Sequence, residues 1–124
     1  MSSGNSVAEF DSSSLSLLRN VTISDPDSLL WSLVVAPTGK SLYVVSQSLI
    51  DLTGDAYRVD LGTFTVAAHA LVNGSPWDVG ATPDASKVYV VGDSNSTALF
   101  EGSTLTQTGA IPTGPAHGIV IAPR

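Results

Sequence analysis

The chain has 124 residues, of which 43% are hydrophobic and 13% charged, so it is long enough for one folded domain and too apolar to be disordered. Its 11 acidic and 5 basic residues give a net charge of −6, which excludes the cationic surface that nucleic acids and anionic membranes require. The absence of cysteine excludes disulfide bonds, thiolate nucleophiles and cysteine-ligated metal sites.

Residues 1–27 predict two strands, near 6–10 and 15–23, joined by a short turn. The turn sequence recurs twice with the same spacing of an apolar residue, an acid, three further residues and a second apolar residue. The three copies are Phe10 to Leu15, Val59 to Phe64 and Phe100 to Leu105. We expect the shared acids to accept hydrogen bonds from the backbone of the turn that follows them; these acids are Asp11, Asp60 and Glu101.

A longer repeat follows, because residues 31–45 align without gaps onto residues 77–91, 46 residues later. A third, shortened copy begins at His117 and includes Pro123. The apolar runs that open the copies predict inner strands buried on both faces, each ended by proline; they are 31–36, 77–82 and 117–122. Turn sequences then lead into a second strand in the two longer copies, at 41–47 and 88–92.

Two further strands are predicted in each longer copy, at 56–61 and 64–71 and at 97–101 and 105–111. Four antiparallel strands in about 40–45 residues is the period of a β-propeller blade. The sequence therefore predicts one all-β domain, 1–124, made of propeller blades that do not complete a ring in one chain. Its parts are the third and outer strands of a partial blade (1–27), two blades (28–74 and 75–114) and the inner strand of a further blade (115–124).

The repeat resembles the YVTN family of β-propellers. The likeness rests on the strands Tyr43-Val-Val-Ser46 and Tyr89-Val-Val-Gly92 and on the turns Pro37-Thr-Gly-Lys40 and Pro83-Asp-Ala-Ser86. The resemblance covers nearly the whole chain, although the tetrapeptides and turns depart from the consensus residues of the family. A more distant resemblance to lactonase-type seven-bladed propellers implies an enzyme as an alternative.

An incomplete ring leaves the flanks of its blades uncovered, and we expect apolar residues there to be exposed: Leu33, Val35, Val79, Ile119 and Ile121. This predicts a homo-oligomer in which copies cover one another's flanks, with strand 117–122 as the element given to a neighbouring chain. The alternative is that the sequence is part of a longer propeller.

The candidate site consists of Trp31, Trp77 and His117, which share one repeat position at the start of an inner strand, where a propeller opens its central channel. Their rings could stack on a sugar, an apolar ligand or a partner loop, or could instead anchor neighbouring blades. Asp78 departs from the repeat, since Ser32 and Gly118 are its equivalents. Asp78 is therefore either a ligand-binding residue that only this copy of the repeat carries or a cap on inner-strand backbone.

Other chemistry finds little support in the sequence. Loop oxygens could gather Ca²⁺, but they lack the spacing of a known calcium loop; they are Asp51, Asp55, Asp93 and Asn95. The histidines, His69 and His117, fall in different layers, and no nucleophile elbow or phosphate-binding loop is present. We therefore expect no catalytic residue, no metal and no cofactor.

The sequence thus favours a non-enzymatic binding module, built from several chains or belonging to a longer propeller, with a protein, small molecule or sugar as ligand. The alternatives are a lactonase-like or cyclase-like enzyme and a structural subunit of an extracellular filament. A low lysine content and a surface rich in serine and threonine favour a location outside the cytoplasm. Whether the sequons at Asn20, Asn73 and Asn95 are used stays open.

Overall fold

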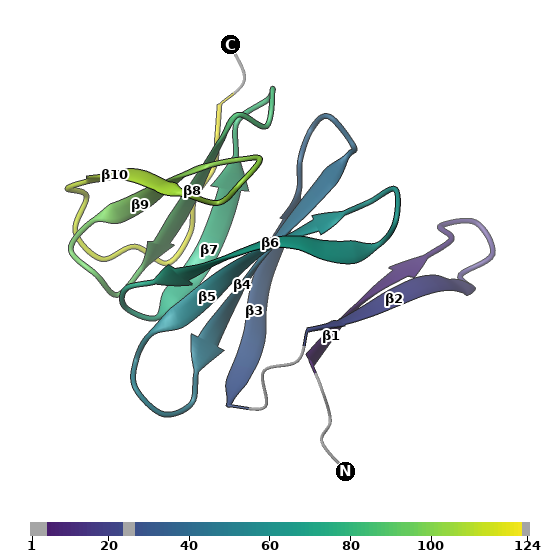
Figure 1. Cartoon of the computed structure of the whole chain (residues 1–124), viewed down its shortest axis with the longest axis horizontal. Coiled ribbons are helices and arrows are strands. Elements are labelled where there is room, and N and C mark those ends of the chain that lie inside the picture. The colour runs from purple at the N-terminus through teal and green to yellow at the C-terminus, as the bar shows by residue number, and fades with distance from the viewer. Residues whose placement is uncertain (1–4, 24–26, 123–124) are drawn as a thin grey trace.

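The computed structural model describes residues 5–23 and 27–122, and all secondary structure in them is β. Ten strands form three antiparallel units, which lie one after another in chain order (Figure 1). The units are a two-stranded hairpin and two sheets of four strands, and they do not close into a ring. The predicted fold class is confirmed. Within the described residues there is no helix that is long and apolar enough to cross a membrane.

The N-terminal hairpin pairs β1 (Asn5–Phe10) with β2 (Leu17–Ile23). One face of the hairpin packs against the first four-stranded sheet. Val7 and Ile23 are buried in a cluster with Val44 and Phe64 of that unit. The guanidinium of Arg19 lies 4.7 Å from the centre of the Phe64 ring and adds a cation–π contact.

The first sheet has the order β3-β4-β5-β6. Its strands are β3 (Ser28–Val35), β4 (Ser41–Ser48), β5 (Gly54–Asp60) and β6 (Thr65–Val72). Valine and tyrosine in β4 are buried on both faces, as expected for a strand with a neighbour on each side and a packed unit on each face. Each predicted strand is present, with ends that differ by at most three residues.

The second sheet repeats this order as β7-β8-β9-β10. Its strands are β7 (Pro76–Ala81), β8 (Lys87–Gly92), β9 (Thr97–Glu101) and β10 (Gln107–Ile111). One face of β7 packs against β3 and β4 of the first sheet. The main buried cluster lies in this contact and includes Tyr43, Val79, Val88 and Phe100. The Tyr43 hydroxyl donates a hydrogen bond of 2.8 Å to the carbonyl of Gly102 across the contact.

Two expectations about the flanks are corrected here. Val79 is buried rather than exposed, because the first sheet covers that face of β7. Residues 117–122 do not form a strand, although they lie beside β7 as an inner strand of a further blade would. Within this chain the described residues supply no second strand for them to pair with. Pro123 and Arg124, which end the predicted further blade (115–124), lie outside the described residues.

The turns between β1 and β2, β5 and β6, and β9 and β10 share one feature of backbone conformation. Leu15, Phe64 and Leu105 each adopt a positive φ, between 54° and 59°. The Asp11 carboxylate accepts hydrogen bonds from the backbone N–H of Ser13 and Ser14, and Asp60 does the same for its own turn. The predicted role is therefore confirmed for these two acids. It is wrong for Glu101, whose carboxylate pairs with the ammonium group of Lys87 instead.

The turn between β7 and β8 depends on a deprotonated acid. The Asp84 carboxylate accepts hydrogen bonds from the Ser86 N–H and from the hydroxyls of Ser86 and Thr82. These bonds favour the charged form and lower the pKa of Asp84 to about 2, with the Ser86 backbone N–H as the largest cause. The turn is therefore tightened by a charge that is present at neutral pH.

We expect Asp84→Asn to lower the melting temperature at pH 7, with the loss shrinking as the pH falls from about 4 toward 2. The sign follows because a lowered folded-state pKa stabilises the fold above the unfolded pKa, and protonation of the folded form removes that contribution. Thermal unfolding of both proteins at several pH values measures the difference. Ser86→Ala is the control, since it keeps the backbone donor and should cost less. A loss that is independent of pH would contradict the prediction.

Candidate functional site

Three aromatic side chains from successive copies of the repeat form one row at the inner strands. The rings of Trp31 and Trp77 meet edge to face, with centroids 5.3 Å apart and planes at 82°. The His117 ring lies on the other side of Trp77, at 4.6 Å and 36°. We call this row, together with Asp78, the inner rim. Trp77 occupies the middle of the row and is partly buried, whereas Trp31 and His117 are exposed.

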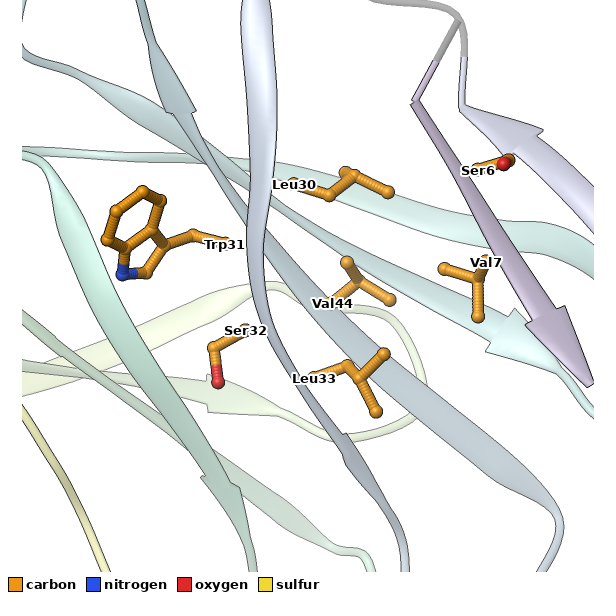
Figure 2. A pocket seen from close by; sticks show the side chains of 7 residues that line it. All are labelled: Ser6, Val7, Leu30, Trp31, Ser32, Leu33 and Val44. Atoms are coloured by element: carbon orange, nitrogen blue, oxygen red, sulfur yellow. The ribbon is translucent and has the colours of Figure 1, made fainter.

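A β-bulge aims each tryptophan into the inner rim. The pairing of β3 with β4 skips Trp31, and the pairing of β7 with β8 skips Trp77 at the same repeat position. An extra residue in one strand turns neighbouring side chains to the same side. Figure 2 shows the result at β3, where Trp31 and Ser32 both point away from Leu30 and Leu33. The repeat therefore specifies the inner rim through backbone pairing as well as through residue type.

Asp78 joins the three copies by hydrogen bonds. Its Oδ1 accepts from the hydroxyl of Ser32 at 2.6 Å, and its Oδ2 accepts from the backbone N–H of Ile119 at 3.1 Å. The first partner belongs to the preceding sheet, and the second belongs to the C-terminal segment, residues 112–122. Asp78 also accepts a hydrogen bond of 2.9 Å from the backbone N–H of Val79 in β7, so it caps inner-strand backbone, one of the two roles expected from the sequence. A carboxylate oxygen can accept more than one hydrogen bond, so Oδ2 can accept a further one.

The inner rim carries negative rather than positive groups. Trp77 donates its indole N–H to the Asp93 carboxylate at 2.6 Å, which fixes the ring against the β8–β9 loop. Asp93 and Asp78 therefore both lie beside the row, in a chain whose net charge is −6. The arrangement suits a neutral or cationic ligand with a flat apolar face, and it opposes an anionic one.

The four residues proposed from the sequence therefore lie together, whereas the loop acids proposed for Ca²⁺ do not. Asp51 lies in the loop between β4 and β5 and contacts Thr53, whereas Asp55 lies in β5 and contacts His69. No group of three or more metal-ligating side chains occurs in the parts of the chain that the structure describes.

One cluster was missed by the sequence analysis. The His69 ring stacks on Tyr57 with centroids 4.8 Å apart, and its Nε2 lies 2.7 Å from the Asp55 carboxylate. Tyr57 and His69 face each other across β5 and β6. Only the strand register brings these residues together, so the sequence offered no signal beyond the presence of the histidine. The cluster lies on the outer half of the first sheet, away from the inner rim.

A pocket of about 360 Å³ opens beside the inner rim, between β1 and β3 (Figure 2). Val7 of the hairpin faces Leu30, Leu33 and Val44 of the first sheet across it. A second pocket, of about 140 Å³, continues along the same gap beside Leu33 and Val35. The gap is lined mostly by apolar side chains and lies where a propeller blade would place its inner strands.

Comparison with known proteins identifies the fold. No protein-family model matches the sequence, and no curated protein matches it. A solved chain of Kuenenia stuttgartiensis hydrazine synthase is similar over 94% of this chain, with a TM-score of 0.75 and 19% sequence identity. The match spans 33% of that chain, so the present sequence corresponds to a third of it. At this identity the likeness shows the fold alone, which is that of propeller-type sheets of four antiparallel strands.

Proposed function

We propose that the chain is a non-enzymatic interaction module of the YVTN type of β-propeller, which assembles from several chains or belongs to a longer propeller and binds its ligand at the inner rim. The observation that carries the proposal is the row formed by Trp31, Trp77 and His117. Successive units contribute one ring each, and the two outer rings are exposed. The strands β4 and β8, with their Tyr-Val-Val sequences, support the YVTN type.

The ligand class follows from the side chains of the inner rim. Flat rings bind the apolar face of a sugar or of a planar group, and a carboxylate accepts hydrogen bonds from its hydroxyls. Asp78 holds its position through Ser32 and Ile119 and can accept a further bond at Oδ2. A neutral oligosaccharide combines an apolar face with hydroxyl donors and carries no negative charge. It is therefore the ligand class that this surface fits best.

The experiment uses the fact that the chain contains two tryptophans, both in the inner rim. We expect titration with cellotetraose, maltotetraose or chitotetraose to change the tryptophan emission saturably for at least one of them. Because a stacking contact is worth about 0.5–1.5 kcal/mol, Trp31→Ala should weaken that binding about two- to twelvefold, measured by calorimetry.

The control is His69→Ala, which removes an exposed ring from the outer half of the first sheet and should leave the affinity unchanged. An emission that does not respond to any of the three sugars would contradict the proposed ligand class. Equal affinities for Trp31→Ala and the unmodified chain would contradict the proposed site.

A further inference from the structure

The two flanks of the molecule expose apolar residues whose repeat equivalents are buried inside the chain. On β3, the side chain of Leu33 is 51% exposed, whereas its equivalent on β7, Val79, is 3% exposed. In the N-terminal hairpin, Phe10 is 58% exposed, whereas its equivalent Phe100 is fully buried. We call the surface formed by Phe10, Leu15, Leu33 and Val35 the head. Exposure of several large apolar side chains of this kind marks an interaction surface.

The contact inside the chain shows what covers such a surface. Val79 and Phe100 are buried because the first sheet lies against them, with Val34 and Tyr43 packed in the same cluster. Tyr43 also donates its hydrogen bond to Gly102, in the turn that follows Phe100. The covering surface is therefore the face of a propeller-type sheet that looks toward the next unit, and it includes an inner-strand valine and a second-strand tyrosine.

On the C-terminal side, the described residues present that same covering surface without covering it themselves. Val120 stands at the repeat position of Val34 and is 92% exposed. Tyr89 stands at the position of Tyr43 and lines an open groove of about 560 Å³ with Asp84 and Ile121. Ile119 and Ile121 pack beside Gly80 on the face of β7 that points away from the first sheet. We call the surface formed by Tyr89, Val120 and this groove the tail.

We propose that the head of one chain binds the tail of a second copy of the same chain, reproducing between chains the contact that joins the first and second sheets. The inference deepens the proposed function, since it rests on the chain being a module that assembles. Val120 of one copy enters the gap between β1 and β3 of the next, beside Leu33 and Val35. This gap is the pocket shown in Figure 2.

The hairpin completes the same docking. Once Val120 occupies the gap, the turn after Phe10 lies in the groove beside Tyr89, as the turn after Phe100 lies beside Tyr43. Ser12 stands at the repeat position of Gly102, so its carbonyl accepts the hydrogen bond that the Tyr89 hydroxyl donates. The contact is head to tail, which generates a closed ring or an open filament and not a two-fold pair built from identical patches.

The absence of native cysteine gives a direct test. Two single variants, Leu33→Cys and Val120→Cys, are treated with a short bis-maleimide crosslinker, separately and as an equimolar mixture. We expect a crosslinked dimer from the mixture and none from either variant alone. Both sites are exposed, so the variants should fold, and thermal unfolding checks this. The matched control is Leu71→Cys, exposed on the outer strand β6, mixed with Val120→Cys.

Light scattering gives an independent readout. We expect the unmodified chain to exceed the mass of a monomer as its concentration rises, Leu15→Glu to remain monomeric, and Leu71→Glu to behave as the unmodified chain does. A monomer at all concentrations would overturn the proposal, and so would a crosslinked dimer from one variant alone or from the Leu71 control. Sugar binding at the inner rim is measured separately by tryptophan emission, so a failed assembly does not imply a failed ligand site.

Discussion

Replacing Phe100 with alanine is expected to lower the free energy of unfolding by about 3–5 kcal/mol, the range for removing a fully buried phenylalanine. Phe100 is the largest side chain with no exposed surface, and it lies in the cluster between the two sheets. The rest of this cluster is mostly valine and alanine held by β-sheet backbone, so the cavity cannot collapse fully. The substitution therefore weakens the packing that holds the two sheets together.

Urea unfolding at a chain concentration low enough to keep the protein monomeric measures this loss. The matched control is Phe10→Ala, which removes the same side chain at the same repeat position, where it is 58% exposed. We expect the control to change the free energy of unfolding by less than about 1 kcal/mol, since little surface is buried there. Similar losses for the two variants would show that the cluster around Phe100 contributes no more than an exposed ring does.

The repeat made most of the fold predictable, because each strand could be checked against its equivalent. All ten observed strands overlap predicted ones, and β9 (Thr97–Glu101) has the predicted ends. The remaining expectation, a strand at 117–122, failed for a physical reason. A strand requires a hydrogen-bonded neighbour, and Ile119 finds only a carboxylate oxygen of Asp78 within the described chain.

The candidate site was predictable to the extent that the repeat encodes it. Trp31, Trp77 and His117 lie in one row because equivalent positions in successive units face the same axis, a rule that needs no knowledge of packing. The bulges that aim the tryptophans could not be predicted, since bulges depend on the pairing of two strands. The Tyr57–His69 stack was missed for the same reason.

Exposure of the flanks could not be derived from residue type. Leu33 and Val79 are both apolar and stand at one repeat position, yet one is exposed and the other buried. The difference lies in what stands beside each strand. β7 has the first sheet against it, whereas the hairpin beside β3 leaves the gap lined by Val7 and Leu33 open. Burial here is a property of the neighbouring unit and not of the sequence motif.

Gly102→Ala is the second large expected effect, because there is no room for a methyl group at this position. An added Cβ would lie 1.9 Å from the carbonyl oxygen of Ala85, which is backbone of the neighbouring turn and cannot rotate away as a side chain would. Both backbone polar groups of Gly102 are also hydrogen-bonded. Its N–H donates to the Ser86 carbonyl at 2.9 Å, and its carbonyl accepts from the Tyr43 hydroxyl. A shift of this residue therefore strains a turn of its own sheet and the contact between the two sheets.

We expect Gly102→Ala to lower the free energy of unfolding by about 3 kcal/mol, at the upper end of the range for overpacking. Gly109→Ala is the matched control, since nothing lies near an added Cβ there and the residue has no positive φ, so its effect should stay within about 0.5 kcal/mol. Combining Gly102→Ala with Tyr43→Phe should cost less than the sum of the two single losses, because the first change already displaces the carbonyl that Tyr43 binds. Urea unfolding of the four variants decides this, and strictly additive losses would show that the turn moves without disturbing the sheet contact.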